Sequence, residues 1–337
     1  MLFVGSESNR NKKPVESTLP INIDELVFDL KQPIPEQQIV LTVNEKIVGS
    51  LGSMVVLTGK PKARKSTFLH FILASAITHR SYYGIQCKLP DAKKTIVLID
   101  TEQSNFELYN SIGRLSKLTG IPIHELNNYN FIVYSARKLD ASEIRLMVNE
   151  ILQKIPNIGI LAIDGAIDLI NDINDVKESK NIIQNIKFWI DTYSILFITI
   201  IHQNKSTNFS LGHLGSFASR FAQSELSIEK NDDGSSTMKS VYLRSDDNFA
   251  DIEIEWDETN KIYIEKHKNT IDWITVEHES IINKIFANKD IYKYNELVPI
   301  LAKQYLKSEY FVKNHIVPFL FDNKLIAKHK TGIVKFR

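Results

Sequence analysis

The regular alternation of strand-like and helix-like segments is the feature that most constrains the fold of this chain. From residue 54 to residue 201, short apolar runs rich in β-branched residues alternate with stretches whose apolar residues recur at helical spacing. Such alternation favours a mostly parallel sheet with helices on both faces, so the sequence predicts a doubly wound α/β domain. The expected strands are 54–58, 95–100, 131–135, 158–164 and 195–201, and the expected helices are 68–78, 106–119, 141–155 and 176–193.

The chain divides by its sequence pattern into three parts. Residues 1–38 begin with a polar stretch that lacks periodicity and continue with extended, proline-punctuated sequence, so a flexible N-terminal arm is expected. Residues 39–268 contain the α/β pattern, which opens with an edge strand or hairpin at Ile39–Val43. Residues 271–337 follow a different pattern and are expected to form a separate small domain.

The sequence pattern of the α/β part changes after a Gly/Ser-rich segment at residues 206–219. Four strand-like runs follow, and turn sequences such as Asp232-Asp233-Gly234 separate them. Antiparallel hairpins that extend the sheet at one edge fit this spacing. These runs are residues 225–229, 237–244, 252–256 and 262–265.

Composition sets limits on location and partners. The 337 residues carry a formal net charge of +1, so any contact with a polyanion must come from a local basic patch. The single cysteine, Cys87, excludes an internal disulfide, and no histidine lies at zinc-binding spacing from a cysteine. No run of about 18 uncharged apolar residues is present. A cytoplasmic protein with no membrane contact is expected, whose only metal is an ion carried in by a nucleotide.

A phosphate-binding loop is predicted between the first buried strand and the first helix. The sequence Gly-Lys-Pro-Lys-Ala-Arg-Lys-Ser matches G-x-x-x-x-G-K-[ST] except that Arg64 replaces the second glycine, and arginine does not adopt positive φ cheaply. This departure affects hydrolysis more than binding of ATP, and the alternative is a basic surface turn leading into a helix. The residues expected to bind ATP are Gly59, Lys60, Pro61, Lys62, Ala63, Arg64, Lys65, Ser66 and Thr67.

Three further strands end in polar residues at the edge where open α/β sheets bind ligands. Glu102 follows one strand and is the expected general base, while Asp164 ends another and is expected to hold Mg²⁺ together with Ser66. His202 and Gln203 end the third and are the expected sensor of the terminal phosphate. An ordinary strand terminus is the alternative for Asp164, and a polar loop cap for the sensor pair.

With these motifs in order, residues 40–268 resemble the RecA-like ATPases, in particular replicative helicases of the plasmid RepA type and related ATPases of bacterial mobile elements. Gly59–Ser66 resembles Walker A, Ile99–Glu102 the strand that delivers the catalytic glutamate, and Ile160–Asp164 Walker B. The segment His202–Lys205, followed by Gly212–Ser216, is similar to the family's sensor strand and mobile DNA-facing loop. Leu211 departs from the pattern, since related sequences tend to carry a basic residue there.

The resemblance implies a homo-oligomeric ring, expected to be a hexamer, with ATP bound between subunits. Arg244, with Arg220 behind it, would reach the neighbour's terminal phosphate as a catalytic finger, although an arginine at a strand end is commonly a solvated charge. Lys205 and His213 would contact single-stranded DNA.

The last part of the chain is expected to be a winged-helix domain. Its pattern predicts helices at 276–287, 295–306 and 308–322, the last capped by Ser308, followed by strands at 325–329 and 333–336. Lys328 and Lys330 in the wing would contact DNA phosphates. Protein docking is the alternative use of this domain.

The leading hypothesis is an ATPase with helicase-like action in the replication or mobilisation of a plasmid or integrated element, together with a partner protein encoded elsewhere. A nucleotide-gated loader that recruits such a partner without unwinding DNA is a second hypothesis. A scaffold whose phosphate loop has lost its function is the third, and Arg64 motivates it.

Overall fold

The computed structural model describes residues 24, 27–31, 33–34, 36–203, 212–266, 278–287, 289–305, 309 and 312–336. The chain divides into two units, residues 1–37 and 38–337. In the first unit, the Lys31 amide donates to the Asp29 carboxylate (2.9 Å). Every strand in the described part of the chain belongs to the second unit.

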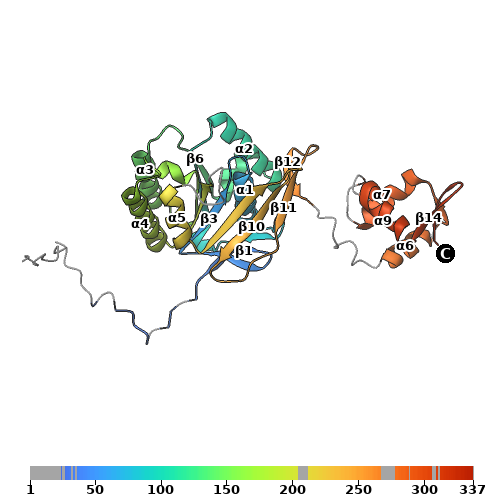
Figure 1. The fold of residues 1–337 in the computed structure, drawn as a ribbon, viewed down its shortest axis with the longest axis horizontal. Helices are drawn as coiled ribbons and strands as arrows, with labels where there is room; N and C mark the ends of the chain where they lie inside the picture. The colour runs from blue at the N-terminus through green and yellow to red at the C-terminus, as the bar shows by residue number, and fades with distance from the viewer. Residues whose placement is uncertain are drawn as a thin grey trace, which may run out of the picture. The chain divides into compact units, whose positions relative to one another are not determined.

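A nine-stranded sheet forms the centre of the second unit, in the order β12-β11-β10-β9-β3-β8-β7-β5-β6 (Figure 1). The six strands from β9 to β6 are parallel, and β10, β11 and β12 are antiparallel. The strands are β3 (Ser53–Gly59), β5 (Thr95–Asp100), β6 (Phe131–Ser135), β7 (Ile158–Asp164), β8 (Leu196–His202), β9 (Ser224–Lys230), β10 (Ser236–Leu243), β11 (Ile252–Asp257) and β12 (Ile262–Glu265). The predicted α/β class, with antiparallel hairpins at one edge, is confirmed.

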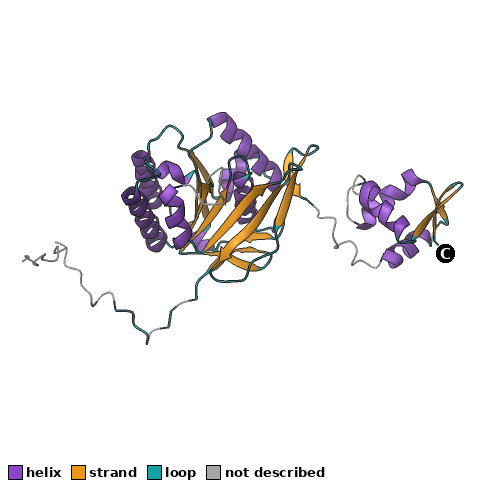
Figure 2. Ribbon diagram, viewed as in Figure 1, coloured by secondary structure: helices purple, strands orange, loops and turns teal. Residues whose placement is uncertain are grey.

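Helices cover both faces of this sheet (Figure 2), because successive side chains of a buried strand point to opposite faces. In β3, Val55 and Leu57 belong to one apolar core, while Met54 and Val56 belong to the other. The α-helices in this part of the chain are α1 (Lys65–Thr78), α2 (Asn105–Thr119), α3 (Ala141–Lys154), α4 (Val176–Tyr193) and α5 (Gly212–Phe221). Short 3-10 helices lie at η2 (Asp91–Lys93), η3 (Ile123–Tyr129) and η4 (Ala166–Leu169).

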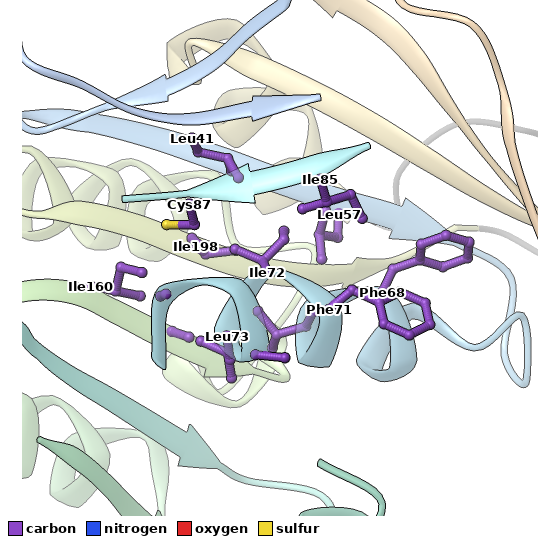
Figure 3. Packing of buried hydrophobic residues seen from close by; sticks show 14 of the residues in the cluster. Leu41, Leu57, Phe68, Phe71, Ile72, Leu73, Ile85, Cys87, Ile160 and Ile198 are labelled. Atoms are coloured by element: carbon purple, nitrogen blue, oxygen red, sulfur yellow. The ribbon is translucent and has the colours of Figure 1, made fainter. Parts of the chain in front are cut away.

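Helix α1 is buried along nearly its whole length, which fixes the end of the loop that precedes it. Figure 3 shows Phe68, Phe71, Ile72 and Leu73 of α1 packed among residues of several strands. One side of this packing is a separate sheet of order β2-β1-β4, formed by β1 (Ile39–Val43), β2 (Lys46–Ser50) and β4 (Ile85–Cys87). The predicted hairpin at the start of the domain is therefore present, and its sheet lies over α1.

One prediction about the segment after β8 is wrong. Residues 212–216, expected as part of a mobile loop, form the first half of α5, because Leu214, Phe217, Ala218 and Phe221 recur at helical spacing and pack against the core. After α5, β9 pairs parallel to β3 on one side and, as predicted, antiparallel to β10 on the other.

The C-terminal segment has its own apolar core. Strands β13 (Ile291–Tyr292), β14 (Ile326–His329) and β15 (Gly332–Lys335) form a sheet of order β13-β15-β14, accompanied by α6 (His278–Phe286) and α7 (Tyr294–Tyr305). The expected helix at 308–322 is helical in its described part, but it is not α-helical throughout. A π-helical turn, η5 (Val312–Ile316), precedes α9 (Val317–Asp322), since Pro318 suits the first turn of a helix and disrupts a helix interior. Ser308, the expected cap, lies outside the described residues.

Within the described residues, no helix combines the length and the apolar character needed to cross a membrane.

Trp189 is the residue whose loss should most weaken the α4 face of the core. Its side chain is 1% exposed, and its indole N–H donates to Asn149 Oδ1 in α3 (2.7 Å). We expect Trp189→Ala to lower the free energy of unfolding by about 3–5 kcal/mol in urea denaturation, because it leaves a large cavity. The adjacent Phe188 is 59% exposed, so Phe188→Ala should change it by less than about 0.5 kcal/mol. Equal losses in the two variants would contradict this packing.

Candidate functional site

Four neighbouring parallel strands deliver polar residues to one edge of the sheet. Gly59 at the end of β3 is in register with His202 at the end of β8, and Asp100 of β5 with Asp164 of β7. Because carboxyl ends of parallel strands open toward the same side, the loops that follow them meet there.

The loop after β3 turns directly into α1 and holds Lys65 at its base. The Lys65 side chain is 5% exposed, and Nζ donates to the carbonyls of Gly59 and Lys60 at 3.0 Å each. Burial lowers the pKa of Lys65, while the nearby carboxylates of Asp164 and Glu102 act in the opposite direction. The first turn of α1 also carries backbone N–H groups without intrahelical partners, which favour an anion.

The close approach of β9 explains the glycine at position 59. A Cβ added to Gly59 would lie 2.3 Å from the carbonyl oxygen of Ile228, so no side chain fits between the loop and β9. Arg64, at the position of the second glycine, adopts φ 74° and ψ 33° in the left-handed region. The disfavoured conformation that the sequence indicated for an arginine there is thus present.

Asp164 is the buried acid of the site. Its carboxyl lies near the Ser66 side chain, and Thr101 Oγ1 donates to its backbone carbonyl (2.9 Å). Burial is the main cause that raises the pKa of Asp164 to about 7; the nearby charges of Asp100 and Glu102 act in the same direction, and Ser66 and Lys65 act against it.

His202 links the lysine to the expected general base. Its Nδ1 lies 3.2 Å from Lys65 Nζ, and its Nε2 lies 2.9 Å from Glu102 Oε1. An ammonium group can only donate, so Nδ1 accepts from Lys65 and Nε2 donates to the carboxylate. This hydrogen bond from His202 is the main cause that lowers the pKa of Glu102, which favours the ionised base.

The structure brings together only part of the sequence-predicted set. Lys65, Ser66, Glu102, Asp164 and His202 form one cluster at the strand ends. Gln203 is instead fixed on β3, where its amide N–H donates to the Gly59 carbonyl (3.0 Å) and its side chain to Thr58 Oγ1 (3.3 Å).

The remaining predicted residues lie elsewhere. Arg244 is exposed, and its guanidinium donates to the carbonyl of Arg220. His213 is exposed in α5, with its ring stacked on Phe217. Lys328 and Lys330 are exposed in the C-terminal sheet region, and Lys205 lies outside the described residues.

Sequence reasoning missed two acids at this edge. Asp100 is 1% exposed and accepts from the backbone N–H groups of Glu102 (3.2 Å) and Gln103 (2.7 Å), so it shapes the turn that presents Glu102. Its position at the end of an apolar run could have predicted that it lies at this edge of the sheet. Asp168 in η4 lies beside Glu102 and His202, and burial raises its pKa. No sequence pattern distinguished Asp168 from an ordinary helix residue.

The donor set fits a magnesium nucleotide. Mg²⁺ in such sites is held by one or two protein oxygens together with phosphate oxygens and water, and the neighbouring side chains of Ser66 and Asp164 supply oxygens of this kind. Lys65 and the start of α1 supply positive charge and N–H donors for phosphates. In the described part of the chain, no group of three or more His, Cys, Asp or Glu side chains is placed to hold a metal ion.

No protein-family model and no curated protein sequence matches this chain.

The raised pKa of Asp164 should appear in the pH dependence of stability. In the folded protein Asp164 keeps its proton up to about pH 7, whereas its ordinary value is 3.8. Folding therefore binds a proton between these two pH values, and stability falls as pH rises through this window. We expect Asp164→Asn, which carries no ionisable group, to gain stability relative to the natural protein from pH 4 to pH 7. Urea denaturation without magnesium or nucleotide measures this difference, and a difference independent of pH would contradict the burial of Asp164.

Proposed function

We propose that this protein is a RecA-like ATPase that hydrolyses ATP as a homo-oligomer and acts on single-stranded DNA. The observation that carries this proposal is the hydrogen-bonded series Lys65–His202–Glu102 beside the buried Asp164, directly after a phosphate-loop sequence. A basic surface turn has no need of a buried lysine joined to a carboxylate through a histidine. Replication or mobilisation of a plasmid or integrated element, with a partner protein encoded elsewhere, is the process that the family resemblance indicates.

Each residue of the cluster has a chemical task in this proposal. Lys65 and the N–H groups at the start of α1 bind the β- and γ-phosphates of ATP. Ser66 and Asp164 hold Mg²⁺, which neutralises charge on the transferred phosphoryl group. Glu102, kept ionised by His202, orients and activates the attacking water.

His202 is suited to report the state of the terminal phosphate. Its imidazole contacts the lysine that would bind this phosphate and also the base that would direct water to it. When Lys65 turns from the loop carbonyls to a phosphate, the hydrogen bond on Nδ1 is lost and the Glu102 contact changes with it. Both changes, at Lys65 and at His202, need only side-chain rotation.

A ring, with a hexamer as the expected form, would complete the site with a group from the neighbouring subunit. Arg244 and Arg220 line a pocket of about 460 Å³ together with Lys180 and Lys187. In the part of the chain that the structure describes, none of these four side chains forms a salt bridge. A surface with this charge suits the phosphates of a nucleotide bound to another copy, and Arg244 is the proposed finger.

The C-terminal segment is proposed to be a winged helix. Its three-stranded sheet, together with α6 and α7, is compatible with that fold. Lys328 and Lys330, both exposed, are the proposed phosphate contacts there, and Lys205 and His213 those of the ATPase part.

Magnesium-dependent ATP hydrolysis, with and without single-stranded DNA, tests the proposal. DNA should stimulate hydrolysis by the natural protein. Glu102→Gln should lower turnover roughly 100- to 10,000-fold, because it removes the base, but should keep ATP binding. Lys65→Ala should lose the thermal stabilisation by MgATP, which a bound ligand otherwise produces. Lys239→Ala, which removes the exposed ion pair between Lys239 of β10 and Glu229 of β9, is the control and should behave like the natural protein.

Two other outcomes distinguish the alternatives. If the natural protein binds MgATP tightly but does not hydrolyse it, the helicase-like function is contradicted and a nucleotide-gated loader is favoured. Absence of any MgATP-induced stabilisation would favour a scaffold without nucleotide function.

Mixing of variants tests the shared site. Arg244→Ala should lower turnover by roughly 1,000-fold or more while MgATP affinity stays unchanged, because the finger acts on the transition state. If the finger acts between subunits, a mixture of Arg244→Ala and Lys65→Ala should regain activity, since some interfaces then combine an intact Lys65 with an intact Arg244. A mixture as inactive as its components, under conditions where mixed oligomers are shown to form, would refute a shared site.

A further inference from the structure

Arg64 stands where a phosphate-binding loop ordinarily has glycine. It adopts φ 74° and ψ 33°, a conformation that L-residues rarely take. It is also the N-cap of α1, but its side chain makes no capping hydrogen bond. A residue held in such a backbone conformation persists when surrounding contacts stabilise it, so the contacts of its side chain are the relevant observation.

The Arg64 side chain reaches the antiparallel edge of the sheet. Its guanidinium donates to the Gly234 carbonyl (2.5 Å) and to Ser236 Oγ (2.8 Å). The same group lies over the ring of Tyr263 in β12, 4.7 Å from the ring centroid. Two hydrogen bonds and an aromatic face together hold a planar cation in one orientation, which a lysine could not match.

These anchoring groups are themselves held in place. The turn between β9 and β10 is closed by hydrogen bonds between Asn231 and Ser235, and Lys266 pairs with Asp233 (2.5 Å) and with Glu253 of β11 (2.6 Å). The Tyr263 ring packs edge-on against Trp256 at 5.0 Å between centroids. The guanidinium therefore binds to a part of the sheet with its own supporting contacts.

We propose that Arg64 is a positioning residue of the nucleotide site, and that the turn between β9 and β10 with Tyr263 is the anchor of the phosphate loop. A glycine would allow the left-handed turn but would not hold it. Arg64 holds it through its side chain and so keeps Lys65, Ser66 and the neighbouring N–H groups in the orientation for phosphate. This inference rests on the proposed function for its ligand, but the anchoring of the loop can be measured without nucleotide.

Arg64→Gly removes the side-chain contacts and also relieves the left-handed conformation, so the loss of anchoring and the relief of strain act on the loop in opposite directions. We expect amide hydrogen exchange of residues 59–66 in the protein without nucleotide to become roughly tenfold faster, and MgATP to bind roughly tenfold more weakly, as the loss of a charged hydrogen-bond donor predicts. KM should rise with little change in kcat, because loop position affects binding of substrate and transition state alike. Arg64→Lys should recover only part of the affinity.

Changes on the anchor side provide an independent test that leaves Arg64 in place. Ser236→Ala and Tyr263→Leu should each shift loop exchange and MgATP affinity in the same direction by a smaller factor. Ser236→Ala should add little in the Arg64→Gly background, as expected for partners in one interaction. Lys239→Ala, on the same strand as Ser236 but paired with Glu229, is the matched control and should leave both quantities unchanged.

The proposal would be overturned if Arg64→Gly showed the same amide exchange in the loop and the same MgATP affinity as the natural protein, or if it bound MgATP more tightly. Arg64 would then be a tolerated substitution. Should Arg64→Gly fail to fold, Ser236→Ala and Tyr263→Leu decide by the same criteria. Should the natural protein bind no nucleotide, the proposed function fails. The exchange rates of the loop then still decide whether Arg64 anchors it.

Discussion

The buried ammonium of Lys65 is the interaction on which the site depends. A charge taken out of water is costly unless hydrogen bonds and opposite charge surround it, and here two loop carbonyls, an imidazole and two nearby carboxylates do so. The carbonyls of Gly59 and Lys60 require the loop to curl around the amine. The imidazole requires β8 to end beside β3, and the carboxylates require β5 and β7 to end at the same edge. The sheet order thus brings together the groups that surround this charge.

Asp164 is the buried acid of the same cluster. It lies deep enough for its pKa to rise to about 7 through burial, and the nearby charges of Asp100 and Glu102 act in the same direction. A site that concentrates acids around a buried carboxylate is stabilised by a cation brought in with phosphates. The electrostatic cost in the protein alone is therefore consistent with a site built for magnesium and a nucleotide.

Arg64 extends this dependence beyond the parallel strands. Because its guanidinium is fixed on the turn between β9 and β10 and on Tyr263, the antiparallel strands also contribute to the position of the loop. In the sequence, Arg64 looks like a defect in a glycine-rich motif. In the structure its side chain has partners far along the chain, about which a local motif carries no information.

The sequence by itself determined the elements whose signals are local. Apolar runs that end in polar residues located β5, β7 and β8, and with them Asp164, Glu102 and His202, because strand burial and strand termination are encoded within a few residues. The helical spacing of Leu214, Phe217, Ala218 and Phe221 was equally readable, but the glycines and serines around it favoured a loop. Tertiary structure alone decided the parallel pairing of β9 with β3, the joining of Lys65 to Glu102 through His202, the position of Asp168 beside them and the anchoring of Arg64. Each of these depends on which segments the folded sheet brings together, and that is fixed by packing between residues distant in the chain.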